Sequence, residues 1–184
     1  MNKTSILLSF LMLFFLSCKN DSKIEKDIKE LVGREIVFPE DGQVITRGEH
    51  STFDVLTHKK IKVVSYFDYF ECTSCNIDLI DMANSKIKEL DNNVTFLGII
   101  YNKDEKSIHK MFDTLNISAP ILYYNTEIFG KKNDLKDRTT SCKTFLLDEN
   151  NKIVLVGEPF NNKKLETLYR KHIAELRRKE VMDK

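Results

Sequence analysis

The stretch that decides the fold runs from Val63 to Cys75 and reads VVSYFDYFECTSC. Its first half is an apolar, β-rich run with poor alternation, which is typical of a strand buried on both faces of a sheet. Its second half ends in a Cys-x-x-Cys pair, Cys72 and Cys75. A helical pattern of apolar residues begins at Cys75. The order strand, CxxC, helix is typical of a thiol–disulfide redox site.

The composition indicates one globular domain with a sizeable core. The chain has 184 residues, of which 41% are hydrophobic and 31% charged. These fractions are those of an ordinary globular protein. The formal net charge of +1 argues against a nucleic-acid partner, since such proteins carry a basic face.

Residues 1–17 are predicted to be a signal peptide rather than part of the fold. Lys3 gives a positive start, and an apolar segment too short to span a bilayer follows it. The segment ends in Ser17-Cys18, which resembles a bacterial lipoprotein signal. That resemblance implies cleavage before Cys18 and lipidation of Cys18. The alternatives are an ordinary secretory peptide and an uncleaved anchor. In each case we expect export from the cytoplasm.

The remaining chain divides into a tether with a short helix, residues 18–32, and one domain, residues 33–180. Ser22 and Glu25 form a capping box that opens the short helix, and Gly33 can end it. We expect strands over 36–38, 61–67, 94–101, 120–124, 144–147 and 153–156. We expect helices over 75–90, 108–115 and 165–176, one helical turn near 128–129, and a loop or hairpin over 40–50. The last two strands should form a hairpin.

This order predicts an α/β fold. Strands and helices alternate, and the chain closes with a β-hairpin and one helix. We therefore expect a mixed central sheet with helices on both faces.

The chain resembles thioredoxin-like proteins over residues 33–180, and in particular the membrane-anchored TlpA-like and ResA-like thiol–disulfide oxidoreductases. The strand followed by Cys72-Thr73-Ser74-Cys75 is similar to the active-site turn of that family. Residues 144–148, TFLLD, and the following Asn151-Lys152-Ile153 resemble its C-terminal hairpin. The resemblance implies a thioredoxin-like fold and a disulfide reductase facing the periplasm, lipid-anchored in a Gram-negative envelope.

Three positions differ from the family pattern. Glu71 stands where a Trp usually precedes the first Cys, and Cys142 stands at the place of the cis-proline. Tyr66 stands at the place of a buried acid, with Asp68 close by. If Cys142 takes the proline's place, its thiol faces the CxxC pair. It would then be a third thiol for exchange or soft-metal binding. The alternative is a small buried apolar residue.

Cys72 is the predicted nucleophile, because a helix N-terminus favours a thiolate. Glu71 opposes this, since a neighbouring negative charge disfavours the thiolate. Cys75 is predicted to resolve the mixed disulfide. Thr73 and Ser74 can donate hydrogen bonds to a thiolate. Asp68 is a candidate proton acceptor for Cys75, with an exposed loop carboxylate as the alternative.

The predicted partners are protein or small-molecule thiols and disulfides, the membrane through a lipid on Cys18, and an unidentified electron donor. We expect no organic cofactor and no resident metal. An inert disulfide is one alternative for the CxxC pair, although so short a loop stabilises little. A second is a copper-binding or chaperone module using Cys72, Cys75 and Cys142. A third is a thiol peroxidase, which Tyr69 disfavours because that family has Thr at its place.

Overall fold

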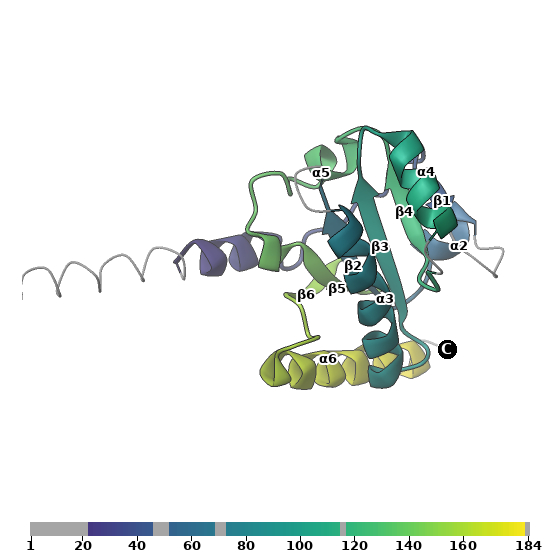
Figure 1. The fold of residues 1–184 in the computed structure, drawn as a ribbon. Coiled ribbons are helices and arrows are strands. Elements are labelled where there is room, and N and C mark those ends of the chain that lie inside the picture. Colours follow the sequence, from purple (N-terminus) through teal and green to yellow (C-terminus); the bar gives the residue numbers. More distant parts are fainter. Residues whose placement is uncertain (1–21, 46–51, 69–72, 115–116, 183–184) are drawn as a thin grey trace, which may run out of the picture.

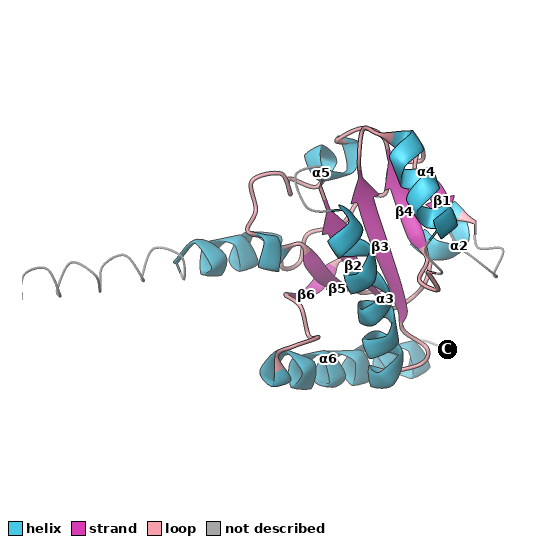
Figure 2. Cartoon of the chain, viewed as in Figure 1, coloured by secondary structure: helices cyan, strands magenta, loops and turns pink. Residues whose placement is uncertain are grey.

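The computed structural model describes residues 22–45, 52–68, 73–114 and 117–182. Figure 1 shows a central sheet with helices packed against it, and Figure 2 shows the same view by type of element. The predicted signal peptide and Cys18 lie outside the described residues.

A mixed six-stranded sheet in the order β1-β4-β3-β2-β5-β6 forms the centre of the fold. The pairs β2–β3 and β3–β4 are parallel, whereas β1–β4, β2–β5 and β5–β6 are antiparallel. The strands are β1 (Gln43–Ile45), β2 (Lys62–Phe67), β3 (Thr95–Tyr101), β4 (Ile121–Tyr124), β5 (Thr144–Leu147) and β6 (Ile153–Val156). The strand that precedes the CxxC pair therefore lies inside the sheet, as its apolar run predicts.

The helices connect and cover these strands. They are a helix over residues 22–31, then α2 (Phe53–Thr57), α3 (Thr73–Leu90), α4 (Glu105–Thr114), α5 (Ile128–Lys132) and α6 (Lys163–Met182). A single turn of 3-10 helix, η1 (Thr140–Cys142), precedes β5. The predicted alternation of strands and helices, the C-terminal hairpin and the final helix are confirmed.

Two hydrophobic clusters lie on opposite faces of the sheet. The first cluster joins α3, α4 and α6 to the sheet, with Ile80 and Tyr169 among its buried members. The second joins α2, α5 and the helix over 22–31 to the other face, with Leu31 and Phe129 among its members. Neighbouring strand residues alternate between the two clusters because successive side chains point to opposite faces. The predicted cover on both faces is confirmed.

The expected strand over 36–38 is not present. Ile36 and Phe38 pack against the second cluster, but the backbone there bonds to loops. The Ile36 N–H donates to the Asn151 carbonyl over 2.8 Å, and the Val37 N–H donates to Asn133 Oδ1 over 2.8 Å. The prediction was wrong because the pairing stops at one isolated bridge, between Glu35 and Lys152, and the three apolar residues that follow Glu35 extend no ladder.

Besides η1, two further short elements were not predicted. β1 lies within the segment expected to be a loop or hairpin, and it pairs with β4 at one edge of the sheet. α2 spans five residues and is capped by Thr52, whose hydroxyl accepts from the Val55 N–H. Elements this short show no clear hydrophobic period, so only their tertiary contacts reveal them.

The helix over 22–31 is attached to the domain by buried polar contacts as well as by Leu31. Asp27 is 4% exposed. Its carboxylate accepts from the Thr139 N–H over 3.1 Å, from the Thr139 hydroxyl over 3.0 Å and from Arg138 Nη1 over 3.0 Å. Residues 22–31 are therefore part of the packed structure rather than a free tether.

Candidate functional site

The candidate redox site lies where β2 ends and α3 begins. β2 ends at Phe67, and α3 begins at Thr73. Cys72 therefore directly precedes the first residue of a helix of 18 residues, and Cys75 falls in its first turn. This backbone arrangement follows the predicted order of strand, CxxC and helix.

The described residues define this site only in part. Cys72 and Glu71 lie outside them. Thr73, Ser74 and Cys75 are described as helical backbone, and their side chains lie outside the described set. The roles predicted for these five residues remain predictions.

The start of α3 suits a thiolate electrostatically. The free N–H groups and the dipole of a helix start favour negative charge, and this lowers the pKa of cysteines placed there. The first turn of α3 contains no acidic residue, and its two lysines, Lys86 and Lys88, lie near its other end. Within α3 itself, no carboxylate therefore competes with a thiolate at the first turn.

Asp68 follows β2 directly and is not an exposed loop carboxylate. Its side chain is 15% exposed and lies 2.7 Å from Lys143 Nζ, measured to Oδ2. Lys143 is 6% exposed on its side chain and was not singled out by the sequence. The sequence gives one indirect sign that Lys143 is unusual. This charged residue stands between Cys142 and the apolar strand β5, both of which are buried. The structure thus adds a buried cation to the end of β2.

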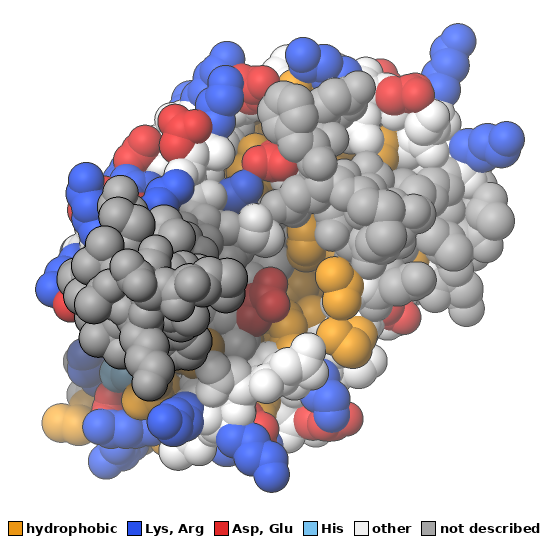
Figure 3. All heavy atoms as spheres, turned by 60° about the vertical axis from the view of Figure 1, so that its left-hand side comes forward, with side chains coloured by type: hydrophobic (Ala, Val, Ile, Leu, Met, Phe, Trp, Pro, Cys, Tyr) orange, Lys and Arg blue, Asp and Glu red, His pale blue; other side chains and the backbone are white. Residues whose placement is uncertain are grey.

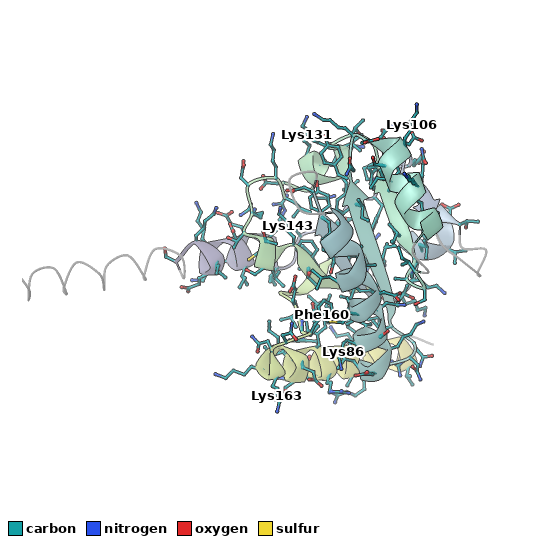
Figure 4. The ribbon with its side chains drawn as sticks, in the orientation of Figure 1. Lys86, Lys106, Lys131, Lys143, Phe160 and Lys163 are labelled. Atoms are coloured by element: carbon teal, nitrogen blue, oxygen red, sulfur yellow. The ribbon has the colours of Figure 1, made fainter. Side chains whose placement is uncertain are left out.

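Lys143 is held at this place by the pairing of β2 with β5. The ladder joins Ser65 to Thr144, and the two hydroxyls lie 2.9 Å apart. One step further, the Tyr66 N–H donates to the Lys143 carbonyl over 2.9 Å. The ammonium lies 5.8 Å from the centroid of the Tyr66 ring, within the range of a cation–π contact. Figure 4 shows Lys143 within the outline of the fold and Lys163 at its margin.

A small pocket opens beside Asp68 at the same end of the sheet. It is lined by Tyr66, Asp68, Tyr101, Glu127, Gly130, Lys131 and Lys136. Glu127 lies 3.2 Å from Lys131 Nζ and 3.7 Å from Lys136 Nζ. The hydrogen bond from Lys131 lowers the pKa of Glu127 against the smaller opposing effect of burial. Charges of both signs therefore border the pocket.

Cys142 belongs to the second hydrophobic cluster, whereas α3 packs against the first. It is 1% exposed, carries a free thiol and ends the 3-10 turn before β5. Ile80, Ala83 and Ile87 of α3 belong to the first cluster, on the opposite face of the sheet. Burial raises the pKa of the Cys142 thiol. These surroundings are those expected of a small buried apolar residue, and the role of Cys142 stays a prediction.

Within the described ranges, no three His, Cys, Asp or Glu side chains gather in a way that could hold a metal ion. No helix in those ranges is long and apolar enough to cross a membrane. Figure 3 shows acidic and basic side chains interspersed around one face of the molecule.

Comparison with known proteins identifies the fold. No family model and no curated protein matches the sequence. Among solved structures, the chain is similar to a thioredoxin-like protein solved in its oxidised form. The TM-score is 0.52, the sequence identity is 14%, and the match covers 80% of this chain and 99% of that one.

Two further solved structures are similar to a comparable degree. One is a candidate thiol–disulfide oxidoreductase from Bacteroides vulgatus, with a TM-score of 0.52, 15% identity and coverage of 75% and 94% of this and that chain. The other is AhpC from Enterococcus faecalis, with a TM-score of 0.54, 15% identity and coverage of 79% and 95%. The chain has a thioredoxin-like fold, as predicted. At sequence identities this low, structural similarity establishes the fold alone, and the chemistry has to be argued from the residues of the site.

Proposed function

We propose that this protein is a thiol–disulfide oxidoreductase that acts through Cys72 and Cys75. The observation that carries the proposal is the start of α3 at Thr73, directly behind a strand inside the sheet. In the sequence, the CxxC pair extends from the residue before this helix into its first turn, and thiolates are favoured at such a position. The fold is also that of a candidate thiol–disulfide oxidoreductase, so this fold is compatible with the proposed chemistry.

The proposed reaction is a pair of thiol–disulfide exchanges. The Cys72 thiolate attacks one sulfur of a substrate disulfide, forming a mixed disulfide and releasing the first substrate sulfur as a thiolate. The Cys75 thiolate then attacks the Cys72 sulfur, which releases the second substrate thiolate and leaves a Cys72–Cys75 disulfide. The two substrate thiolates take up protons from solvent. A dithiol donor of unidentified nature returns the pair to its reduced form by the reverse exchanges.

We propose reduction as the direction, and the cell envelope as the location, with a lipid on Cys18 as the anchor. The support is the sequence pattern before Cys18, together with the resemblance to TlpA-like and ResA-like proteins. Ser22 begins the attached helix only four residues after Cys18. The anchor would therefore hold the domain close to the membrane surface.

The redox test uses a chain from Lys19 onward, which keeps every described residue. We equilibrate it in glutathione buffers of graded potential, then trap free thiols and locate them by mass spectrometry. We expect a Cys72–Cys75 couple in the span of roughly −270 to −180 mV that known oxidoreductases occupy. A bridge that stays closed far below this span would show a structural disulfide and overturn the proposal.

A variant identifies the nucleophile. Cys72→Ser should abolish reduction of insulin disulfides by the protein, because no thiolate remains to attack the substrate. Cys142→Ser serves as the control, and we expect it to retain turnover because Cys142 is buried in the second cluster. Wild-type turnover in Cys72→Ser would show that the nucleophile is wrongly assigned. Stoichiometric copper binding without turnover would instead support the metal-binding alternative.

A further inference from the structure

The last helix, α6, carries basic residues at a regular spacing. Between residues 163 and 179, seven Lys and Arg residues stand against two Glu residues. Six of the seven form adjacent pairs that recur every seven residues: Lys163 and Lys164, Arg170 and Lys171, Arg177 and Arg178. Seven residues make almost two helical turns, so the three pairs follow one side of the helix. We call these six residues the basic stripe.

The fold turns the basic stripe toward solvent. Tyr169 and Ile173 are buried in the first cluster, so the opposite side of α6 packs against the sheet. Five residues of the stripe are exposed, and Arg177 is half-buried. Figure 4 shows Lys163 projecting from the lower margin of the molecule, and Figure 3 shows Lys and Arg side chains along that margin. The formal net charge of the chain is only +1, so the excess on α6 is local.

Carboxylates of the protein compensate the basic stripe only in part. Two of its cations have a close carboxylate partner, Arg170 with Glu166 over 2.9 Å and Arg177 with Asp91 over 2.6 Å. Lys171 lies 4.0 Å from Glu175. Among the described residues, no carboxylate pairs with the remaining three cations of the stripe. The stripe therefore keeps positive charge that can attract an external anion.

The shape of the stripe suits an extended anionic surface. From Lys163 to Arg178 the helix rises about 22 Å, which exceeds the reach of one small anion. Val181 and Met182 continue the same helix and are 76% and 84% exposed. Cations combined with exposed apolar side chains are typical of helices that lie on anionic membranes. A protein partner would need a matching row of carboxylates, whereas such a membrane offers negative charge along its whole surface.

We propose that the basic stripe of α6 docks the domain onto an anionic lipid surface, with the lipid phosphate groups as the partners of its Lys and Arg side chains. This inference rests on the proposed location at the cell envelope. There the anchor on Cys18 would hold the domain beside the membrane, and the stripe would set which side of the domain faces the lipids.

The test measures sedimentation of the unlipidated chain from Lys19 onward with vesicles. One set of vesicles is phosphatidylcholine alone, and the other is an equal mixture of phosphatidylcholine and anionic phosphatidylglycerol. We expect binding to the anionic vesicles only, and we expect it to weaken as salt is added because ions screen exposed charges. The triple variant Lys163→Gln, Lys164→Gln and Lys171→Gln should bind these vesicles more weakly by about tenfold or more.

A second triple variant is the matched control. Lys106→Gln, Lys110→Gln and Lys132→Gln remove the same charge from exposed positions in α4 and α5. Figure 4 shows Lys106 at the opposite margin of the molecule from Lys163. We expect the control to bind within about threefold of the wild type. Glutamine has nearly the helix propensity of lysine, so both variants should keep the circular dichroism spectrum of the wild type.

Three results would overturn the inference: no binding to anionic vesicles, equal binding to both kinds of vesicle, or equal losses in the two triple variants. Retention on polyglutamate without binding to anionic vesicles would also overturn it, in favour of an acidic protein partner. Vesicle binding requires no redox chemistry. A protein that binds through the stripe but fails the glutathione titration would support this inference and overturn the proposed redox function. A redox-active protein that does not bind would overturn the inference alone.

Discussion

Lys62 is a charged residue that the fold buries, although lysine side chains are usually exposed to solvent. It is 0% exposed at the start of β2, between β3 and β5, and its ammonium donates to the Lys59 carbonyl. Burial lowers the pKa of Lys62 to about 8, while the charge of Asp148 acts in the opposite direction. The folded protein thus holds this proton less tightly than the unfolded chain does.

Replacement of Lys62 with Met should stabilise the protein at neutral pH. Below about pH 8 the lysine is charged in both states, so the full cost of burying the charge is present. Between about pH 8 and 10.5 only the unfolded chain stays protonated, so wild-type stability rises with pH. We expect Lys62→Met to raise the free energy of unfolding at pH 7 by up to about 3 kcal/mol, with the difference shrinking toward pH 10.

Urea denaturation at a series of pH values measures this difference. Lys60→Met is the matched control, since Lys60 is exposed two residues earlier. A variant that is equally or less stable than the wild type at pH 7 would show that the contact with the Lys59 carbonyl outweighs the cost of burial.

Gly130 of α5 lies against the ring of Tyr66 from β2. A Cβ at this position would lie 2.5 Å from Tyr66 Oη and 3.0 Å from Cζ. Since Tyr66 is 3% exposed, its ring has little room to move. We expect Gly130→Ala to lower the free energy of unfolding by about 1–3 kcal/mol, despite the better helix propensity of Ala.

A double-mutant cycle with Tyr66→Phe isolates the contact at Gly130. Removal of the hydroxyl takes away the nearest atom, so Gly130→Ala should cost less in the Tyr66→Phe background. Chemical denaturation of the four proteins measures the coupling. Equal costs in both backgrounds would show that another contact limits the size of residue 130.

At the scale of elements, the helix over 22–31 depends on Asp27. Burial raises the pKa of Asp27, but hydrogen bonds from Thr139 and Arg138 outweigh it, and the net shift is downward. The unfolded chain therefore binds this proton more readily. The ionised Asp27 carboxylate therefore stabilises the fold at every pH above the ordinary aspartate pKa near 3.8. This contribution is lost as the pH falls through the lower pKa that Asp27 has in the folded protein.

Asp27→Asn should release this helix before the rest of the fold. The substitution removes the charge of the buried partner of Arg138, whose other partners, Glu30 and Asp134, are exposed, and we expect this to cost about 2–4 kcal/mol. Limited proteolysis should cut the variant within residues 22–33 faster than it cuts the wild type. Glu25→Gln is the control, because Glu25 pairs with Lys29 on the exposed side of the same helix. Equal cleavage of Asp27→Asn and the wild type would contradict the prediction.

At the scale of the whole molecule, the two hydrophobic clusters share one sheet. Val63 and Val64 are adjacent in β2 and both are 0% exposed, yet Val63 belongs to the first cluster and Val64 to the second. Each Val→Ala substitution should lower the free energy of unfolding by about 2 kcal/mol. Because both clusters depend on the same strands, we expect one cooperative transition in each variant.

Circular dichroism and tyrosine fluorescence monitored together through urea denaturation test this. Coincident curves in both variants would show a single folding unit. A separate early transition in Val64→Ala alone would show that the second cluster, with α2, α5 and the helix over 22–31, unfolds independently.

The sequence by itself determined the elements that bury long apolar segments. Burial gives a long element either a regular spacing of apolar residues or an unbroken apolar run, and both can be recognised in the sequence. This made predictable the strands β2, β3, β5 and β6 and the helices α3, α4 and α6. The place of the CxxC pair at the start of α3 was predictable for the same reason, since a strand signal ends and a helix signal begins there.

Only the tertiary structure decided the features that depend on contacts between distant segments. Asp68 and Lys143 are 75 residues apart, and nothing in either neighbourhood indicates their 2.7 Å contact. The separation of Cys142 from the cluster of α3 depends on which face of the sheet its side chain joins. The segment 36–38 bonds to loops rather than to a strand. The physical reason is the same in all three cases. The contact partner comes from a segment that is distant in the sequence, and such a contact produces no periodic pattern in the residues around it.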